Sequence, residues 1–332
     1  MVKYMKSIFR VLCFQTVKLL SLILGVSLVA YLLVRLSPID PVQQFMLGMG
    51  SVSEKKRIEL EAYWGVNESF LGQYFQWIKA VLKGDFGMSL LYRRPVIDII
   101  RERFLNSFLL MFLSWITSGI VGFIIGSIMG MYSNRFLDRI LKKVCIFLSA
   151  VPTFWIGLLS LLVFSVHLGW FPIGFRAPIG VLNDEVTMFQ KLYHMILPSL
   201  TLSFLSFSNI ALHTREKLIQ VLESDYVIFA KARGESKWMI FKRHGIRNMI
   251  LPWVTLQFAS FSEVFGGSVL IENVFSYPGL GQAVAAAGLN SDVPLLLGIT
   301  VISSGFVFIG NFIADHLYGF IDPKFREDNS YE

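Results

Sequence analysis

The chain has 332 residues, of which 54% are hydrophobic and 16% are charged, and its formal net charge is +7. A soluble domain carries about 25% charged residues, so this composition excludes an ordinary soluble protein. An excess of Lys and Arg can indicate nucleic-acid binding, but basic clusters beside apolar segments are the usual signature of membrane topology. We therefore expect a membrane protein without a nucleic-acid partner.

Apolar residues collect in blocks that are long enough to cross a bilayer, whose core of about 30 Å takes about 20 helical residues. Six such blocks lie near 13–35, 107–131, 144–166, 193–213, 249–273 and 294–319. Backbone polar groups must be paired inside lipid, which favours helices, and the alternating pattern of a membrane barrel is not seen. The sequence predicts an all-α membrane protein with six transmembrane helices.

The positions of Lys and Arg predict the orientation of these helices. Both residue types concentrate at the N-terminus, in the loop 132–143 and in the loop before the fifth block, whereas 276–293 contains neither. Positive residues favour the cytoplasmic side, so both termini are expected in the cytoplasm. The first block is too long for a cleaved signal and lacks a cleavage site, so we expect a retained helix. The two cysteines, Cys13 and Cys145, predict neither a disulfide framework nor a metal motif.

These observations divide the chain into four parts. Residues 1–36 form the cytoplasmic N-terminus and the first transmembrane helix, and 37–106 form an extracytoplasmic helical loop region. Residues 107–320 form a five-helix transmembrane core that includes the cytoplasmic loop 214–248, and 321–332 form a cytoplasmic tail.

The extracytoplasmic region contains two predicted amphipathic helices. The first covers 53–60, capped by Ser51 or Ser53, and the second covers 70–82. Pro95 is expected to begin a short helix that runs into the second span. The second helix places four apolar side chains on one face, Tyr74, Trp77, Ile78 and Val81. These aromatic residues favour packing along the outer membrane surface.

The cytoplasmic loop is predicted to form two helices joined at a glycine. Apolar residues at three- and four-residue steps extend the fourth span as a helix from Glu216 to Ala232. Gly234 suits a positive φ at a helix C-terminus, and Ser236 can cap a short helix that contains Trp238. Pro252 is expected in the first turn of the next span. A segment of this kind, with apolar side chains and a basic rim, either docks in a groove of a partner protein or lies on the inner leaflet of the membrane.

Ordered motifs along nearly the whole chain resemble one family of proteins. They are Pro38-Ile39-Asp40-Pro41, Gly84-Asp85-Phe86-Gly87-Met88-Ser89, Val151-Pro152-Thr153-Phe154-Trp155, His194-Met195-Ile196-Leu197-Pro198, Arg215, Asp225-Tyr226, Ala230, Ala232, Gly234, His244, Arg247-Asn248, Leu251-Pro252, Glu272-Asn273-Val274-Phe275-Ser276-Tyr277-Pro278-Gly279-Leu280-Gly281 and Asp322-Pro323-Lys324-Phe325-Arg326. The set is similar to the membrane permeases of the oligopeptide, dipeptide and nickel family of ATP-binding-cassette (ABC) importers. The likeness is to the subunit type with a long first external loop. Ile39 departs from the family's usual Gly, and Ile228-Phe229 departs from the Glu-Ala of the wider importer class.

The resemblance implies the type I ABC importer permease fold in the cell membrane of a prokaryote. It implies as partners two cytoplasmic ATPase subunits, a second permease (a homologue or a second copy) and an extracytoplasmic substrate-binding protein. This chain has no Gly-x-x-x-x-Gly-Lys-Ser/Thr loop, so ATP and Mg are expected in the ATPase subunits, with no cofactor, metal or enzymatic activity here. Short peptides are the expected cargo, with nickel or a metal chelate as the alternative. A self-contained secondary transporter or channel is disfavoured because no inverted halves are visible.

The same resemblance assigns two groups of site residues. The ATPase-coupling loop comprises Asp225, Tyr226, Phe229, Ala230, Ala232, Arg233, Gly234, Trp238, His244 and Arg247. The external motif comprises Glu272, Pro278, Gly279 and Gly281.

Glu263 stands out because it lies near the middle of the fifth apolar block. A carboxylate at bilayer depth is costly, so it is a candidate for the wall of a translocation pathway that favours a cationic substrate. The alternative is a protonated or hydrogen-bonded carboxyl between helices, satisfied by Ser260 or Ser262. The five histidines do not form a ligand cluster by spacing, so no metal site is expected.

Overall fold

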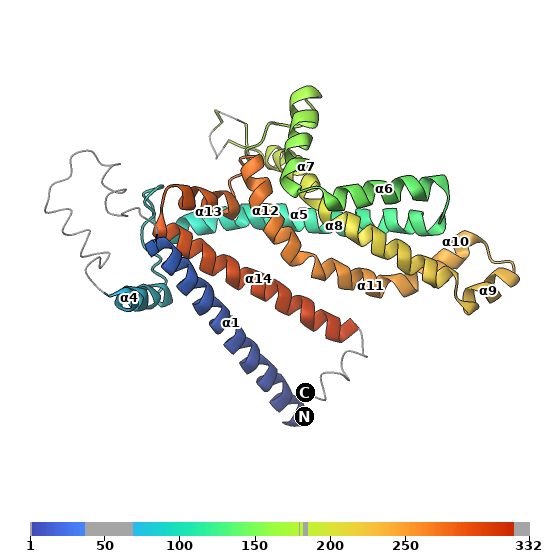
Figure 1. Cartoon of the computed structure of the whole chain (residues 1–332), viewed down its shortest axis with the longest axis horizontal. Coiled ribbons are helices and arrows are strands. Elements are labelled where there is room, and N and C mark those ends of the chain that lie inside the picture. Colours follow the sequence, from blue (N-terminus) through green and yellow to red (C-terminus); the bar gives the residue numbers. More distant parts are fainter. Residues whose placement is uncertain (1, 37–68, 179, 182–184, 322–332) are drawn as a thin grey trace. The chain divides into compact units, whose positions relative to one another are not determined.

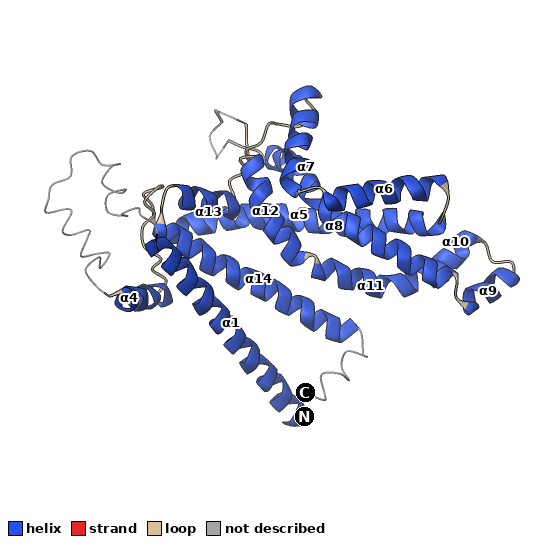
Figure 2. Cartoon of the chain, in the orientation of Figure 1, coloured by secondary structure: helices blue, strands red, loops and turns tan. Residues whose placement is uncertain are grey.

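The computed structural model describes residues 2–36, 69–178, 180–181 and 185–321. Within these ranges every regular element is a helix (Figures 1 and 2). The elements are α1 Val2–Leu36, α4 Phe70–Leu82, α5 Val96–Met131, α6 Phe136–Ala150, α7 Thr153–Ser160, the π-helix η1 Leu161–His167, α8 Met188–Leu222, α9 Asp225–Ala232, α10 Lys237–Ile240, the π-helix η2 Phe241–Gly245, α11 Ile246–Ala259, α12 Phe261–Val274, α13 Leu280–Leu289 and α14 Val293–Ile321.

Three described helices are long and apolar enough to cross a membrane, at 14–33, 96–131 and 293–314. Three further pairs of helical segments meet the same test when each bent pair is counted as one span, which gives up to six. The bends are 109° between 136–150 and 153–167, 47° between 188–204 and 206–222, and 44° between 237–259 and 261–274. The predicted all-helical architecture is confirmed.

The chain divides into two compact units, which are described separately. The first comprises Met1–Leu105 and Gln282–Phe308, and the second comprises Asn106–Gly281 and Ile309–Glu332.

In the first unit, helix α4 has the bounds that its amphipathic pattern predicts. The Ser69 hydroxyl caps it by accepting the Gly72 N–H at 3.3 Å. Tyr74 is buried against α1, where its hydroxyl lies 2.8 Å from Ser27 Oγ and donates to the Leu24 carbonyl at 3.1 Å. The predicted helix at 53–60 lies outside the described residues. The other predicted helix of this region, beginning at Pro95, is the first part of α5, which runs without a break to Met131.

Asp292 is a fully buried carboxylate of the same unit that sequence reasoning missed. It accepts hydrogen bonds from the Ser89 hydroxyl and from the Leu91 N–H, the latter at 3.0 Å. It also accepts the Leu295 N–H at 3.2 Å, in the first turn of α14. One side chain therefore caps α14 and ties it to the turn that precedes α5.

In the second unit, the predicted span 144–166 is not one straight helix. Helix α6 ends at Ala150, Val151 adopts extended backbone, and α7 begins at Thr153 after a bend of 109°. Pro152 explains the break, because proline pushes the preceding residue out of the helical region and has no N–H to continue the ladder.

Two other expected boundaries differ in this unit. The helix expected from Glu216 to Ala232 is interrupted, since α8 ends at Leu222 and α9 begins at Asp225. The Ser224 hydroxyl donates to the Val221 carbonyl, a local bond that competes with a continuous helix. Pro252 lies inside α11 rather than in its first turn, because the π-helix η2 leads directly into α11 at Ile246.

Helices α5 and α11 are joined by reciprocal polar contacts. The Trp115 indole donates to the Gln257 carbonyl at 2.7 Å, and the Gln257 amide donates to the Trp115 carbonyl at 2.5 Å. The Trp253 indole donates to the Gly119 carbonyl at 3.0 Å. These contacts fix the second half of α11 to α5, just before the bend at Ser260.

Candidate functional site

The turn between α9 and α10 is a Schellman motif centred on Gly234. Gly234 has φ +82°, and its N–H donates to the Lys231 carbonyl at 2.9 Å. The Glu235 N–H donates to the Ala230 carbonyl at 3.2 Å, which completes the pair of bonds that defines the motif. The prediction of a positive φ at Gly234 is confirmed.

Helices α9 and α10 fold together over a small apolar core. Ser236 caps α10 as predicted, its hydroxyl accepting the Met239 N–H at 3.3 Å. The buried residues of this core are Val221, Val227, Ala230 and Ile240. We call the segment 225–245, made of α9, the Gly234 turn, α10 and η2, the elbow.

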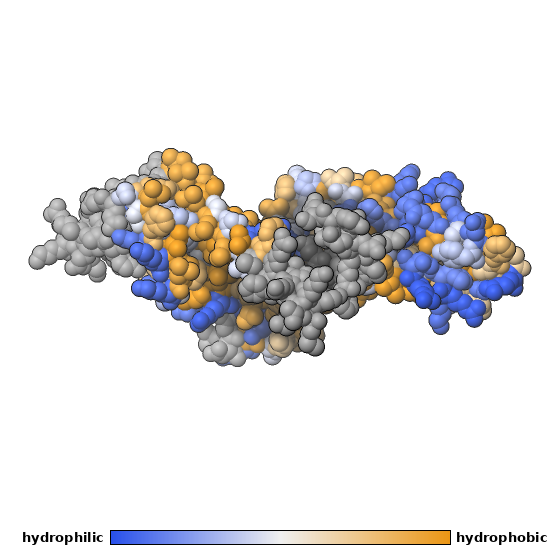
Figure 3. All heavy atoms as spheres, turned by 90° about the horizontal axis from the view of Figure 1, so that it is seen from below, coloured by the Kyte–Doolittle hydropathy of each residue, from blue (hydrophilic) through white to orange (hydrophobic). Residues whose placement is uncertain are grey.

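Large apolar side chains on the elbow remain exposed. Phe229 is 72% exposed and Trp238 is 63% exposed, and three neighbours are exposed to a smaller extent, Tyr226, Ile228 and Met239. Figure 3 shows hydrophilic residues gathered at the right-hand end, where α9 and α10 lie, around a smaller hydrophobic group. Exposed apolar groups rimmed by charge are typical of interaction surfaces.

The predicted coupling residues therefore divide between the surface and the interior of the elbow. Ala230 is buried, whereas Ala232 and Arg247 are exposed. Asp225 begins α9, where a negative charge favours the helix N-terminus. The half-buried His244 ring packs against Tyr226 with a centroid distance of 5.7 Å.

Arg233, one of the predicted coupling residues, pairs within the chain. Its Nη2 donates to Glu235 Oε1 at 2.8 Å. Glu235 Oε1 also lies 3.6 Å from Arg243 Nη1, and Glu235 Oε2 lies 4.0 Å from His244 Nε2. Sequence reasoning described this loop by its many basic residues and missed the acidic residue among them.

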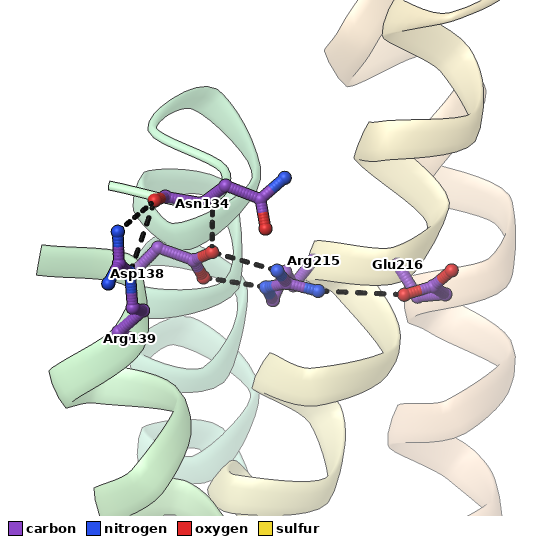
Figure 4. Close-up of polar contacts among 5 residues, drawn as sticks. All are labelled: Asn134, Asp138, Arg139, Arg215 and Glu216. Atoms are coloured by element: carbon purple, nitrogen blue, oxygen red, sulfur yellow. Dashed lines mark hydrogen bonds and ion pairs between the residues drawn. The ribbon is translucent and has the colours of Figure 1, made fainter. Parts of the chain in front are cut away.

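A buried ion pair joins α6 to the end of α8 that leads into the elbow (Figure 4). Arg215 Nε and Nη2 donate to the two carboxylate oxygens of Asp138 at 2.6 Å and 2.8 Å. The Asn134 N–H also donates to Asp138 at 2.7 Å. The side chains of Arg215 and Asp138 are 10% and 2% exposed, so both charges depend on this geometry. Arg215 matched the family pattern in the sequence, whereas its partner 77 residues earlier did not stand out.

The external motif is built around the fully buried Glu272. Its carboxylate accepts the Ser107 hydroxyl at 2.5 Å and the Gly281 N–H at 2.7 Å. A Cβ atom at Gly279 would overlap that carboxyl group, which explains the glycine. The Pro278 carbonyl accepts the amide of Asn106 at 2.7 Å. The structure thus brings Glu272, Pro278, Gly279 and Gly281 together in one packed turn.

The buried phenol of Tyr277 lies in the same turn. Desolvation raises the pKa of Tyr277 to about 12, so the phenol stays neutral at physiological pH. Its N–H donates to the Glu272 carbonyl at 2.8 Å.

Glu263 lies in the first turn of α12, and the Asn209 amide Nδ2 lies 3.5 Å from its Oε1. The expected alternative partners, Ser260 and Ser262, donate elsewhere. Ser260 donates to the Gln257 carbonyl and Ser262 to the Asn311 side chain. The described part of the chain contains no group of three or more His, Cys, Asp or Glu that could hold a metal ion.

The family model described as "Binding-protein-dependent transport system inner membrane component" matches residues 122–327. The chain belongs to this family of membrane permease components, which are not themselves enzymes. It is therefore a multi-pass component of a transport system that works with a binding protein.

Relatives match almost the full length of the chain. The oligopeptide transport system permease protein AppB of Bacillus subtilis is 31% identical over 311 residues, covering 93% of this chain and 97% of AppB. The glutathione transport system permease protein GsiC of Escherichia coli is 33% identical over 303 residues, covering 91% of this chain and 94% of GsiC. A structure of the inward-facing MetNI methionine ABC transporter has a TM-score of 0.49 at 14% identity, covering 68% of this chain and 97% of that chain.

Proposed function

We propose that this chain is the permease subunit of an ABC importer for short peptides and forms half of the translocation pathway. The observation that carries the proposal is the exposed apolar surface on the basic elbow, which lies between the long helices α8 and α11. The similar permeases named for oligopeptide and glutathione transport support a peptide cargo.

The elbow would receive the movement of a cytoplasmic ATPase subunit and pass it to the membrane helices. Phe229 and Trp238 would enter a groove of the ATPase, because burying large aromatic side chains provides much of the free energy at such interfaces. Helix α8 enters the elbow and α11 leaves it, so one docking event acts on both helices. ATP and Mg would be bound by two ATPase subunits, and a second permease and an extracytoplasmic binding protein would complete the importer.

Trp238→Ala is expected to weaken binding of the ATPase subunit by about 30-fold, since an aromatic residue at the centre of an interface contributes about 2 kcal/mol or more. Phe229→Ala should have a similar effect. The affinity of the ATPase subunit for the purified permease in detergent measures this directly, with uptake in vesicles as a second measurement.

The matched control is Phe136→Ala, which removes an aromatic side chain that is 78% exposed on α6, outside the elbow. Wild-type affinity is expected for this variant. Equal affinities for the wild-type chain and for both elbow variants would contradict the docking proposal.

Glu263 is proposed to line the translocation pathway and favour cationic peptides. Glu263→Gln keeps the shape and the amide contact to Asn209 but removes the negative charge. Uptake of a Lys-containing tripeptide should fall about tenfold, since one charge at short range contributes about 1–4 kcal/mol. Uptake of a neutral tripeptide should be unchanged.

Glu223→Gln, at an exposed residue after α8, provides the control for a loss of charge. The Glu263 assignment is wrong if both peptides are taken up equally well by Glu263→Gln and by the wild-type transporter.

A further inference from the structure

Glu235 is an enclosed carboxylate in a loop dominated by basic residues. Its side chain is 9% exposed, whereas those of Arg233 and Arg243 are 72% and 62% exposed. An ionised carboxylate with so little access to water is stable only when charged or hydrogen-bonding groups surround it. The burial of Glu235 therefore requires neighbouring basic side chains that pair with its carboxylate.

The basic side chains around Glu235 come from both flanks of α10. Arg233 precedes α10 and donates to Oε1 at 2.8 Å. Arg243 and His244 follow α10 in η2, and they lie 3.6 Å from Oε1 and 4.0 Å from Oε2. One carboxylate thus connects the two ends of the short helix that carries Trp238.

The backbone directs this side chain inward. Glu235 occupies the position after the glycine in the Schellman motif, where an apolar residue commonly packs against the end of the helix. An apolar side chain would be sufficient to end α9, so a carboxylate here contributes something other than helix termination. The contribution that the geometry shows is the gathering of three basic side chains.

Two atoms at this point are enclosed without a hydrogen-bond partner among the described residues, Glu235 Oε2 and His244 Nε2. They face each other at 4.0 Å, and a small closing movement would form a charge-assisted hydrogen bond of about 2.8 Å. The His244 ring also packs against Tyr226 at the start of α9. The connection therefore reaches from η2 back to the first helix of the elbow.

We propose that Glu235 is a positioning residue that holds Arg233, Arg243 and His244 together as a clasp at the base of the elbow. The clasp restrains α10 and keeps Trp238 and Met239 directed outward. Its effect on ATPase docking rests on the proposed function, whereas the restraint on α10 is a property of this chain alone.

The restraint can be measured with a nitroxide label on α10 in the full-length permease. Met239, 41% exposed, is replaced by Cys in a chain whose native Cys13 and Cys145 are replaced by Ser and Ala. Glu235→Gln is expected to shorten the rotational correlation time of the label, and Glu223→Gln is the matched control with no change. High salt should mobilise the label in the wild-type chain but not in Glu235→Gln, because a Debye length of about 3 Å at 1 M screens the partly exposed pairs.

Affinity for the ATPase subunit, measured on the same variants, should fall about fivefold in Glu235→Gln, as expected for loss of a partly exposed ion-pair network. A correlation time that responds neither to Glu235→Gln nor to salt overturns the clasp, whatever the affinity. A more mobile label with unchanged affinity supports the clasp and contradicts docking through α10.

Discussion

Asp138→Ala is expected to destabilise the permease by about 3–5 kcal/mol, because it leaves the Arg215 guanidinium buried without its counter-charge. The pair is bidentate and its side chains are 2% and 10% exposed, so water cannot replace the lost carboxylate without opening the contact between α6 and α8. Arg215→Ala should destabilise the permease by a similar amount, because it leaves the Asp138 carboxylate buried without its counter-charge. Thermal unfolding of the purified permease, followed by loss of the monodisperse peak in detergent, measures both variants.

An exposed ion pair in the same chain supplies the control. Arg94 Nη1 lies 3.3 Å from Glu102 Oε2, but the two side chains are 55% and 46% exposed. Glu102→Ala is expected to change stability by less than about 1 kcal/mol. Similar thermal unfolding midpoints for Asp138→Ala and Glu102→Ala would show that burial does not determine how much the Asp138–Arg215 pair contributes to stability.

Exchanging the two charged residues at 138 and 215 should not restore stability. The Asn134 N–H donates to the Asp138 carboxylate at 2.7 Å, and a guanidinium at that position would place two donors opposite each other. Restored stability in the exchanged variant would mean that this backbone donor is unimportant.

Ala230→Asp is expected to abolish both uptake and co-purification of the ATPase subunit. Ala230 is 1% exposed in the apolar core between α9 and α10, so the new carboxylate would be buried without a cation beside it. A penalty of several kcal/mol exceeds what this small core provides, so the elbow would open. The permease itself should remain in the membrane, since its long apolar helices are unchanged, and immunoblotting of membranes checks this.

Ala232→Asp is the control for folding of the elbow, because Ala232 is exposed and a charge there remains hydrated. Limited proteolysis should cut the elbow of Ala230→Asp rapidly and leave that of Ala232→Asp as resistant as the wild-type chain. Wild-type uptake by Ala230→Asp would contradict a role for this core.

Local features of the fold were predictable from the sequence because short-range chemistry determines them. Gly234 was recognised because glycine adopts a positive φ at a helix C-terminus without strain, and Ser236 was recognised as a helix cap. The amphipathic pattern gave the bounds of α4, since it records which face packs against a neighbour.

Breaks within apolar blocks were not predictable in the same way. Hydropathy averages over a window, so Pro152, which turns the chain by 109°, was not separated from its apolar surroundings. Pro252 was placed at a helix start by the usual preference, yet the π-helix η2 carries the helix past it. Long-range pairs such as Asp138 with Arg215 leave no local pattern, because the two residues meet only when α6 packs against α8.

The fixed half of α11 has a mechanical consequence for the molecule. Helix α11 is about 21 Å long, at 1.5 Å per residue, and is held to α5 through Trp253 and Gln257. Under the proposed function, force would enter α11 from the elbow at its other end. Pro252, which lacks an N–H, lies immediately before the residues that contact α5. Helix α11 therefore bends most easily at the point where a force from the elbow would act on it most strongly. A force transmitted through the elbow would bend α11 at Pro252, so the displacement that reaches α12 would be smaller than the displacement applied at the elbow.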